Sequence, residues 1–241
     1  MVENALGAAP IVLICEHASN HIPAAYGELG LSEAERASHI AWDPGALGVA
    51  RELSARLDAP LVYATVSRLV LDLNRDPSAP DSITTLSERT EVPGNRNLGA
   101  EDRARRIAEV YRAFHDAVAS LIEARRVAGL VRAVVSVHSF TPVYRGVARP
   151  WHVGLIFNHD KRLALALEAA LRQDRDLVVG MNAPYSPEDR VFHTLERHAE
   201  RQGLAPLMIE IRNDLIATPD RQKSWSDRIG SPLEEAVERM R

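Results

Sequence analysis

The sequence predicts an α/β fold, with a central, mixed and mostly parallel sheet covered by helices on both faces. Two observations support this prediction. Short apolar runs rich in β-branched residues alternate along the chain with longer segments in which apolar residues recur at helical spacing. The 241 residues are enough for one large core, and no linker or internal repeat divides them. We therefore expect a single domain over residues 1–241, with three layers.

Each element follows from its own pattern. Buried strands are predicted where the apolar runs lie, at residues 11–15, 60–66, 132–140, 152–158, 176–182 and 207–212. Amphipathic helices are predicted at residues 43–57, 100–129, 161–173 and 192–203. Pro44 suits the first turn of its helix, and Gly203 stands where helices often end. Residues 76–99 have no clear period, and we expect a loop that shapes a pocket.

Composition excludes several classes of protein. The net charge of -4 gives no basic excess that would attract a nucleic acid. No apolar run approaches the roughly 18 residues needed to cross a membrane, and the N-terminus lacks the features of a secretory signal. Cys15 is the single cysteine, so no internal disulfide can form; we expect it to be a buried core residue in a cytoplasmic protein.

Polar side chains follow several predicted strands, at the edge where ligands gather in α/β sheets. His17 and His138 both leave apolar strands there, and two histidines with a carboxylate are a common ligand set for catalytic zinc. The carboxylate is Asp43 or Glu16; we favour Asp43, because Glu16 adjoins His17 and would point to the opposite face of a continuing strand. Either histidine alone could be a hydrogen-bonded edge residue, and Asp43 alone a helix cap.

Glu210 places a charge inside an apolar strand, between two isoleucines. A buried carboxylate must be paired, protonated or exposed in a cleft, and a raised pKa would suit a general base acting on a metal-bound water. The alternative is a salt bridge with Arg212, two residues further along the same face. Arg68, Arg75 and Arg212 are candidates to bind a substrate carboxylate, because a guanidinium can hold it in a bidentate fork.

Six motifs, in order, resemble the N-formylglutamate amidohydrolase family: "CEHASNHIP", "DPGA", "SRLVLDLNR", "VHSFTP", "GMNAPY" and "IEIRNDL". The resemblance runs from about residue 11 to about residue 216. "SVHSF", "IEIRND" and "LNR" are more distantly similar to segments of zinc carboxypeptidases. The family is grouped with the zinc exopeptidase-like folds, which implies a central mixed sheet with helices on both sides.

The resemblance also implies roles for individual residues. His17 and His138 match the histidine ligands of a zinc ion, Glu210 the general base, and Asn74 with Arg75 the pair that binds the substrate's carboxylate. Zinc carboxypeptidases have a ligand glutamate at the position of Asn20, and asparagine is a poor zinc ligand. Asp43 is then the expected replacement, much as in zinc-dependent cell-wall amidases. Asn20 and His21 would support the ligands or contact substrate.

The implied reaction is zinc-dependent hydrolysis of an N-acyl amino acid, first of all N-formyl-L-glutamate to L-glutamate and formate. Arg212 would hold a second carboxylate or stabilise the oxyanion. A different N-acyl amino acid, a peptide or a cell-wall amide is the nearest alternative substrate, and another divalent ion could occupy the site. A non-catalytic binding protein that kept the fold is the alternative from another class. The expected partner is the small-molecule substrate, with no nucleic acid and no membrane.

Overall fold

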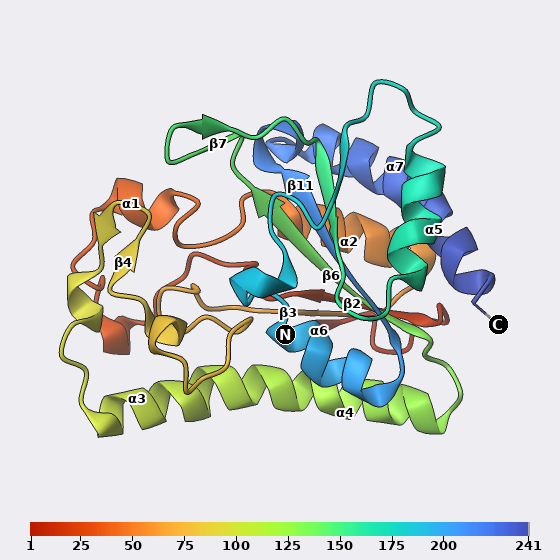
Figure 1. Ribbon diagram of the computed structural model, residues 1–241. Coiled ribbons are helices and arrows are strands. Elements are labelled where there is room, and N and C mark those ends of the chain that lie inside the picture. The colour runs from red at the N-terminus through yellow and green to blue at the C-terminus, as the bar shows by residue number, and fades with distance from the viewer. Residues whose placement is uncertain (241) are drawn as a thin grey trace.

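The computed structural model describes residues 1–240 and is built around one central sheet (Figure 1). Its seven strands lie in the order β1 (Val2–Glu3), β3 (Leu61–Tyr63), β2 (Ile11–Cys15), β6 (Ala133–Phe140), β11 (Ala205–Arg212), β9 (Val153–Ile156) and β10 (Val179–Met181). The four strands β3, β2, β6 and β11 are parallel, whereas β1 on one side and the β9–β10 pair on the other run in the opposite direction. This confirms the predicted mixed and mostly parallel sheet.

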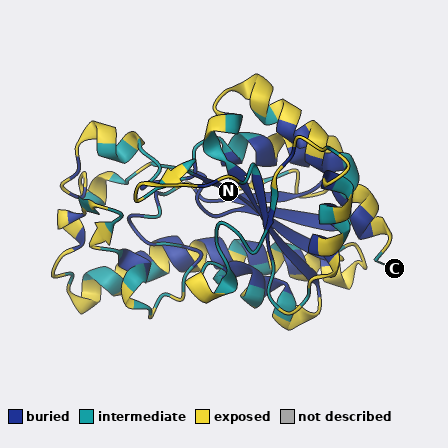
Figure 2. Cartoon of the chain, turned by 45° about the horizontal axis from the view of Figure 1, so that its top comes forward, coloured by how far each residue is buried: buried dark blue, intermediate teal, exposed yellow. Residues whose placement is uncertain are grey.

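Helices cover both faces, as predicted. One face packs against α2 (Ala46–Leu57), α5 (Arg162–Leu171) and α7 (Pro219–Glu238), and the other against α4 (Ala113–Val127) and α6 (His193–His198). Figure 2 shows the inner strands of the central sheet dark blue, with exposed residues on the outer sides of the helices and on the hairpins. Alternate side chains of β2 enter the two cores, since Leu13 and Cys15 face one and Val12 and Ile14 the other. Cys15 is therefore a buried core residue, as expected.

The predicted helix 100–129 is not one continuous α-helix. It consists of α3 (Ala100–Arg106), a π-helical segment at Ile107–Arg112, and α4. The predicted apolar face is nevertheless the face that packs on the sheet, because Val110, Phe114 and Val118 are buried in the same core cluster. The predicted helix 192–203 is likewise divided, into α6 and a 3-10 turn at Glu200–Gln202, and Gly203 ends it with a positive φ of 72°.

The C-terminal helix α7 had no counterpart among the predicted elements. Its buried residues Trp225, Ile229, Leu233 and Ala236 recur every three or four positions, and they pack against α2 and α5. Thr218 caps its first turn by accepting a hydrogen bond from the backbone N–H of Arg221. Pro232 lies inside the helix, which is why the sequence pattern alone does not indicate one long helix here.

Two small hairpins project from the framework. The first, β4 (Leu86–Ser87) and β5 (Thr90–Glu91), lies within the region 76–99 that was expected to be an irregular loop. The second consists of β7 (Val143–Tyr144) and β8 (Val147–Ala148) and directly follows β6. The remaining short helix is α1 (Glu33–Ala37), which begins at a capping box formed by Ser32 and Glu35. In the described residues, no helix is both long and apolar enough to cross a membrane.

Candidate active site

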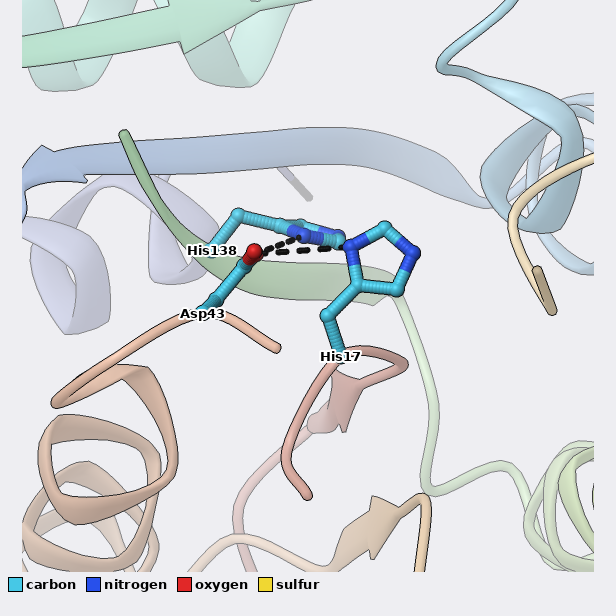
Figure 3. Close-up of side chains that lie close together, drawn as sticks. All are labelled: His17, Asp43 and His138. Atoms are coloured by element: carbon cyan, nitrogen blue, oxygen red, sulfur yellow. Dashed lines mark hydrogen bonds and ion pairs between the residues drawn. The ribbon is translucent and has the colours of Figure 1, made fainter. Parts of the chain in front are cut away.

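The carboxyl edge of the parallel strands brings His17, Asp43 and His138 together (Figure 3). His17 follows β2, His138 lies near the end of the neighbouring strand β6, and Asp43 precedes α2. Asp43 Oδ2 lies 2.8 Å from His138 Nδ1 and 3.4 Å from His17 Nδ1. All three residues are buried, and one potential ligand atom from each lies within 4.8 Å of the others. The residues predicted to bind a metal therefore form one cluster, called here the metal cluster.

The "DPG" sequence explains how Asp43 reaches this position. Its backbone N–H donates to the carbonyl of His17 at 2.9 Å, which ties the start of α2 to the end of β2. Gly45 has a φ of +83°, and a Cβ there would stand 2.4 Å from the carbonyl oxygen of Ile216. Only glycine allows this close approach, so the chain turns into the helix with the Asp43 carboxylate aimed at the two histidines.

The far nitrogen of each histidine ring faces a second carboxylate. His17 Nε2 lies 2.8 Å from Asp72 Oδ1, and His138 Nε2 lies 3.1 Å from Glu16 Oε2. Glu16 also accepts a hydrogen bond of 2.5 Å from Ser136 Oγ. Such partners fix the ring orientation and leave both Nδ1 atoms turned toward Asp43. Glu16, the alternative ligand in the sequence, is thus on the opposite side of His138 from Asp43.

The same contacts control the charges in the metal cluster. Burial lowers the pKa of His138, but Glu16 and Asp43 outweigh it and raise that pKa well above its usual value. Burial raises the pKa of Glu16, but the charge and hydrogen bond of His138 lower it to about 2. Asp72 is likewise held ionised by His17 in spite of burial, with a lowered pKa. Three carboxylates contact the two rings, and one cation is also present, because Arg68 Nη1 lies 3.3 Å from His17 Nδ1. The excess of negative charge favours a cation between the rings.

The guanidinium of Arg68 already donates hydrogen bonds to other groups of the protein. Its Nη1 donates to Asp43 Oδ1 at 3.0 Å, its Nε donates to the carbonyl of Ile40 at 3.0 Å, and its Nη2 donates to the carbonyl of His39. Arg68 lines the cavity beside the metal cluster, so the prediction placed it in the right region. Its main structural effect is to hold and neutralise Asp43.

Glu210 lies on β11 directly opposite His138 of β6 in the parallel register. It lines the cavity, only 4% of its surface is exposed, and its Oε2 has no hydrogen-bond partner in the described part of the chain. Burial raises its pKa to about 7. A carboxyl group that gains and loses a proton near neutral pH suits a general base.

The structure does not bring Arg212 into this site. Its guanidinium pairs with Asp214, with Nε 2.8 Å from Oδ1, and it does not line the cavity. The alternative salt bridge between Arg212 and Glu210 is also absent. Arg212 ends its strand, and Asp214 on the following turn is close enough to capture its guanidinium.

Asn74 and Arg75 both line the cavity, but their polar groups have protein partners. Asn74 donates to the carbonyl of Val191 and accepts from the N–H of Thr194 at 3.0 Å, so it fastens two distant segments together. Arg75 pairs with Asp81 at 2.9 Å and lies 3.5 Å from Asp72.

Asn20 and His21 do not reach the cavity. Asn20 donates to the carbonyl of Arg36 at 3.1 Å, and the exposed His21 lies beside it in a separate surface depression. The chain turns away after His17, so residues three and four positions later face α1 instead of the metal cluster. The structure therefore does not place Asn20 and His21 where they were expected, in contact with the metal ligands or with a substrate in the cavity.

The cavity has a volume of about 320 Å³, enough for a small molecule. The metal cluster and Glu210 line it on one side, and the β4–β5 and β7–β8 hairpins contribute Leu86, Glu88, Tyr144 and Arg145. Asp72 and Tyr185 also line it and were missed in the sequence. The signal for Asp72 was its place in an apolar run within "SRLVLDLNR", and Tyr185 ends the "GMNAPY" motif.

Two histidines and an aspartate around a shared point, with a buried acid beside them, define the site of a hydrolase that can use a metal. The comparisons specify this class further. The N-formylglutamate amidohydrolase family model matches residues 9–217, so the chain belongs to the N-formylglutamate amidohydrolase family and is an amidohydrolase. This sets aside the alternative of a non-catalytic protein.

The similar solved structures include two that span nearly the whole chain. A gene product from Agrobacterium tumefaciens shares 45% identity, with a TM-score of 0.97, over 100% of this chain and 95% of that chain. N-formylglutamate amidohydrolase from Ralstonia eutropha has the same fold, with 22% identity and a TM-score of 0.67 over 98% of this chain and 96% of that chain. A search of curated proteins gave no match.

Proposed function

We propose that this amidohydrolase is zinc-dependent and hydrolyses N-acyl amino acids, with N-formyl-L-glutamate as the first substrate to test. The proposal rests mainly on one observation: the metal cluster lies beside Glu210, which stands opposite His138 on the adjacent strand. The cluster suits zinc, because two imidazole nitrogens and one carboxylate oxygen are buried around one point and the far ring nitrogens are held by acids. Family membership supports the substrate.

His17, Asp43 and His138 would hold the zinc ion. When bound, zinc lowers the pKa of a coordinated water to roughly 7 and polarises the carbonyl of the amide. Arg68 keeps Asp43 ionised and in place through its 3.0 Å hydrogen bond. Asp72 and Glu16 keep the two rings in the orientation that directs both Nδ1 atoms inward.

Glu210 carries the proton transfers. Its carboxylate takes a proton from the attacking water as the new carbon–oxygen bond forms. The protonated carboxyl then gives that proton to the amide nitrogen, and the carbon–nitrogen bond breaks. For N-formyl-L-glutamate the products are formate and L-glutamate. A pKa near 7 lets one group perform both steps.

The test measures zinc content and turnover together. Protein purified without added metal should contain close to one zinc per chain and hydrolyse N-formyl-L-glutamate faster than N-acetyl-L-glutamate or N-formylated peptides. Glu210→Gln should keep its zinc but lose roughly 10²- to 10⁴-fold in kcat. Glu234→Gln, an exposed acid on α7, is the matched control and should behave like wild type. Full activity in Glu210→Gln would contradict the assigned role, and faster cleavage of another amide would replace the substrate.

A further inference from the structure

The proposed substrate is an anion, yet most of the positive charge around the cavity is already paired. Three arginines line the cavity. Arg68 is bound to Asp43 and Arg75 to Asp81, while Arg145 lies exposed at the tip of the β7–β8 hairpin. A carboxylate entering the site would have to compete with Asp43 or Asp81 for the first two. Within residues 1–240 Arg145 has no acidic partner, but water screens its exposed charge. An unpaired positive charge that is shielded from water would have to come from another residue.

Arg149, just after β8, has this unpaired charge. Only 8% of it is exposed, and it forms no ion pair with an acid in the described residues. Its guanidinium packs between aromatic rings, 4.5 Å from the centre of Tyr144, 4.8 Å from Tyr185 and 5.8 Å from Phe140. All three rings line the cavity. A buried cation without an anion is costly, so this arrangement favours an anion that arrives with the ligand.

Tyr185 connects this charge to the cavity. Its hydroxyl oxygen accepts a hydrogen bond of 3.1 Å from Arg149 Nη1, and its own proton has no acceptor among residues 1–240. Burial and the nearby charge of Glu210 raise the pKa of Tyr185 to about 12. The phenol therefore stays protonated at neutral pH and presents a hydrogen-bond donor, polarised by Arg149, to the cavity.

The backbone holds Tyr185 firmly in place. It lies on the segment after β10, in which Asn182 Oδ1 accepts a hydrogen bond of 2.9 Å from the N–H of Phe157. The segment presses against β9, where a Cβ on Gly154 would stand 2.2 Å from the carbonyl oxygen of Ala183. A donor fixed in this way can bind an oxygen without first being ordered.

We propose that Tyr185 and Arg149 together bind an anionic oxygen of the substrate, a binding role that rests on the proposed function. The oxygen has two sources: the permanent carboxylate of the amino acid, or the amide oxygen that becomes negative as water attacks. Tyr185 makes the hydrogen bond, and Arg149 supplies the charge behind it.

The test uses Tyr185→Phe, Arg149→Gln and Arg149→Lys in the zinc-loaded enzyme. Tyr185→Phe keeps the ring that packs on Arg149, so it separates the lost donor from any misfolding caused by removing the arginine. Arg149→Lys keeps the charge and should recover part of the loss. Tyr26→Phe is the matched control: Tyr26 also packs against an arginine, with Arg106 4.9 Å from its ring, but lies outside the cavity. The readouts are kcat, KM and the Kd of L-glutamate measured by calorimetry.

The two sources give different results. If the pair binds the carboxylate, KM and the Kd of L-glutamate rise roughly 10- to 100-fold in Tyr185→Phe and kcat changes little. If it binds the developing oxyanion, kcat falls roughly 10²- to 10³-fold and Kd is unchanged. Unchanged kcat, KM and Kd in both Tyr185→Phe and Arg149→Gln would overturn the proposal, as would an effect of Arg145→Gln alone. If the wild type turns over no amide, the proposed function has failed. In that case the Kd of L-glutamate alone tests the role of Tyr185 and Arg149. The role is overturned if the wild type does not bind L-glutamate, or if the variants bind it as tightly as the wild type.

Discussion

Two pairs of buried histidines in this protein have similar spacing between their rings and opposite electrostatics. The rings of His17 and His138 lie 4.9 Å apart between their centres, and those of His115 and His198 lie 5.1 Å apart. The first pair is surrounded by carboxylates. In the second, the rings hydrogen-bond each other at 2.8 Å, and His115 reaches the carbonyl of Leu73 at 2.9 Å. Among the described residues, only the first pair belongs to a set that could hold a metal.

The groups around each pair, and not the number of histidines, therefore define the site. Burial opposes charge on both pairs. Carboxylates overcome it for His138, whose pKa is raised, whereas burial prevails for His115 and His198 and lowers their pKa values to about 3 and about 4. The second pair is therefore neutral under physiological conditions and packs as part of the core under the loop that carries Asp72 and Asn74.

The largest expected effect comes from removing one ring of each pair. His138→Ala should bind almost no zinc and lose activity, because the two ligands that remain cannot retain the ion. His198→Ala should keep its zinc and lose stability instead. The measurement is elemental analysis beside the thermal midpoint of unfolding. Loss of zinc from both variants to the same extent would remove the distinction between the pairs.

Removing the acids that hold the rings tests why the first pair differs. Asp72→Asn and Glu16→Gln keep all three ligands but weaken the partner of each ring's Nε2. We expect zinc affinity to fall roughly 10- to 100-fold in each variant. Competition with a chelator of known affinity measures this fall. Wild-type affinity in both variants would mean that the rings are oriented by packing alone.

The second pair should make the protein sensitive to acid. Its pKa values are lower in the folded protein than in the unfolded chain, so below about pH 6.5 the unfolded chain binds protons that the folded protein does not. This stability is present above pH 6.5 and is lost as pH falls toward 4, with a slope of about 1.4 kcal/mol per pH unit for each proton.

A matched set of variants isolates that contribution. The double variant His115→Gln/His198→Gln should lose less free energy of unfolding than wild type between pH 7 and pH 5, as measured by urea denaturation. His159→Gln, which removes an exposed histidine, should keep the wild-type slope. Parallel curves for wild type and the double variant would show that the pair is not the source.

The smallest effect is expected outside both pairs. Asn20→Ala should leave zinc content and kcat/KM close to wild type, because Asn20 bonds to the carbonyl of Arg36 and does not line the cavity. Steady-state kinetics with N-formyl-L-glutamate measures this. A large rise in KM would place Asn20 in substrate binding after all and restore the role suggested by the sequence.

The parts of the fold that the sequence predicts are those whose pattern is local. Every predicted strand is present, since a parallel strand buried on both faces reads as a continuous apolar run. The reversed direction of β9 depends on how the chain returns to the sheet, which no local pattern indicates. The π-helical segment and α7 were missed for different reasons. The π-helical segment keeps the apolar face of an ordinary helix, and α7 contains Pro232, which interrupts the helical pattern.

In the candidate site, too, the sequence predicts the residues with a local signal and misses those that depend on distant partners. His17, Asp43 and His138 stand out because each polar residue lies at or near the end of an apolar strand or just before a helix. Asp72 and Arg149 do not stand out, because their importance depends on partners 55 and 36 positions away, His17 and Tyr185. Arg212 lies outside the cavity and pairs with Asp214, a partner two positions away that the sequence interpretation did not consider.

The π-helical segment at Ile107–Arg112 has a consequence for insertions and deletions. A π turn holds about one residue more than an α turn, so the segment contains one surplus residue between two stretches of ordinary helix. Each residue in an α-helix turns the chain by roughly 100°. A deletion within α4 would therefore turn Phe114 or Val118 out of the core, whereas a deletion inside Ile107–Arg112 can be absorbed by converting that turn to α. In this long helix, chain length can change most easily at that turn.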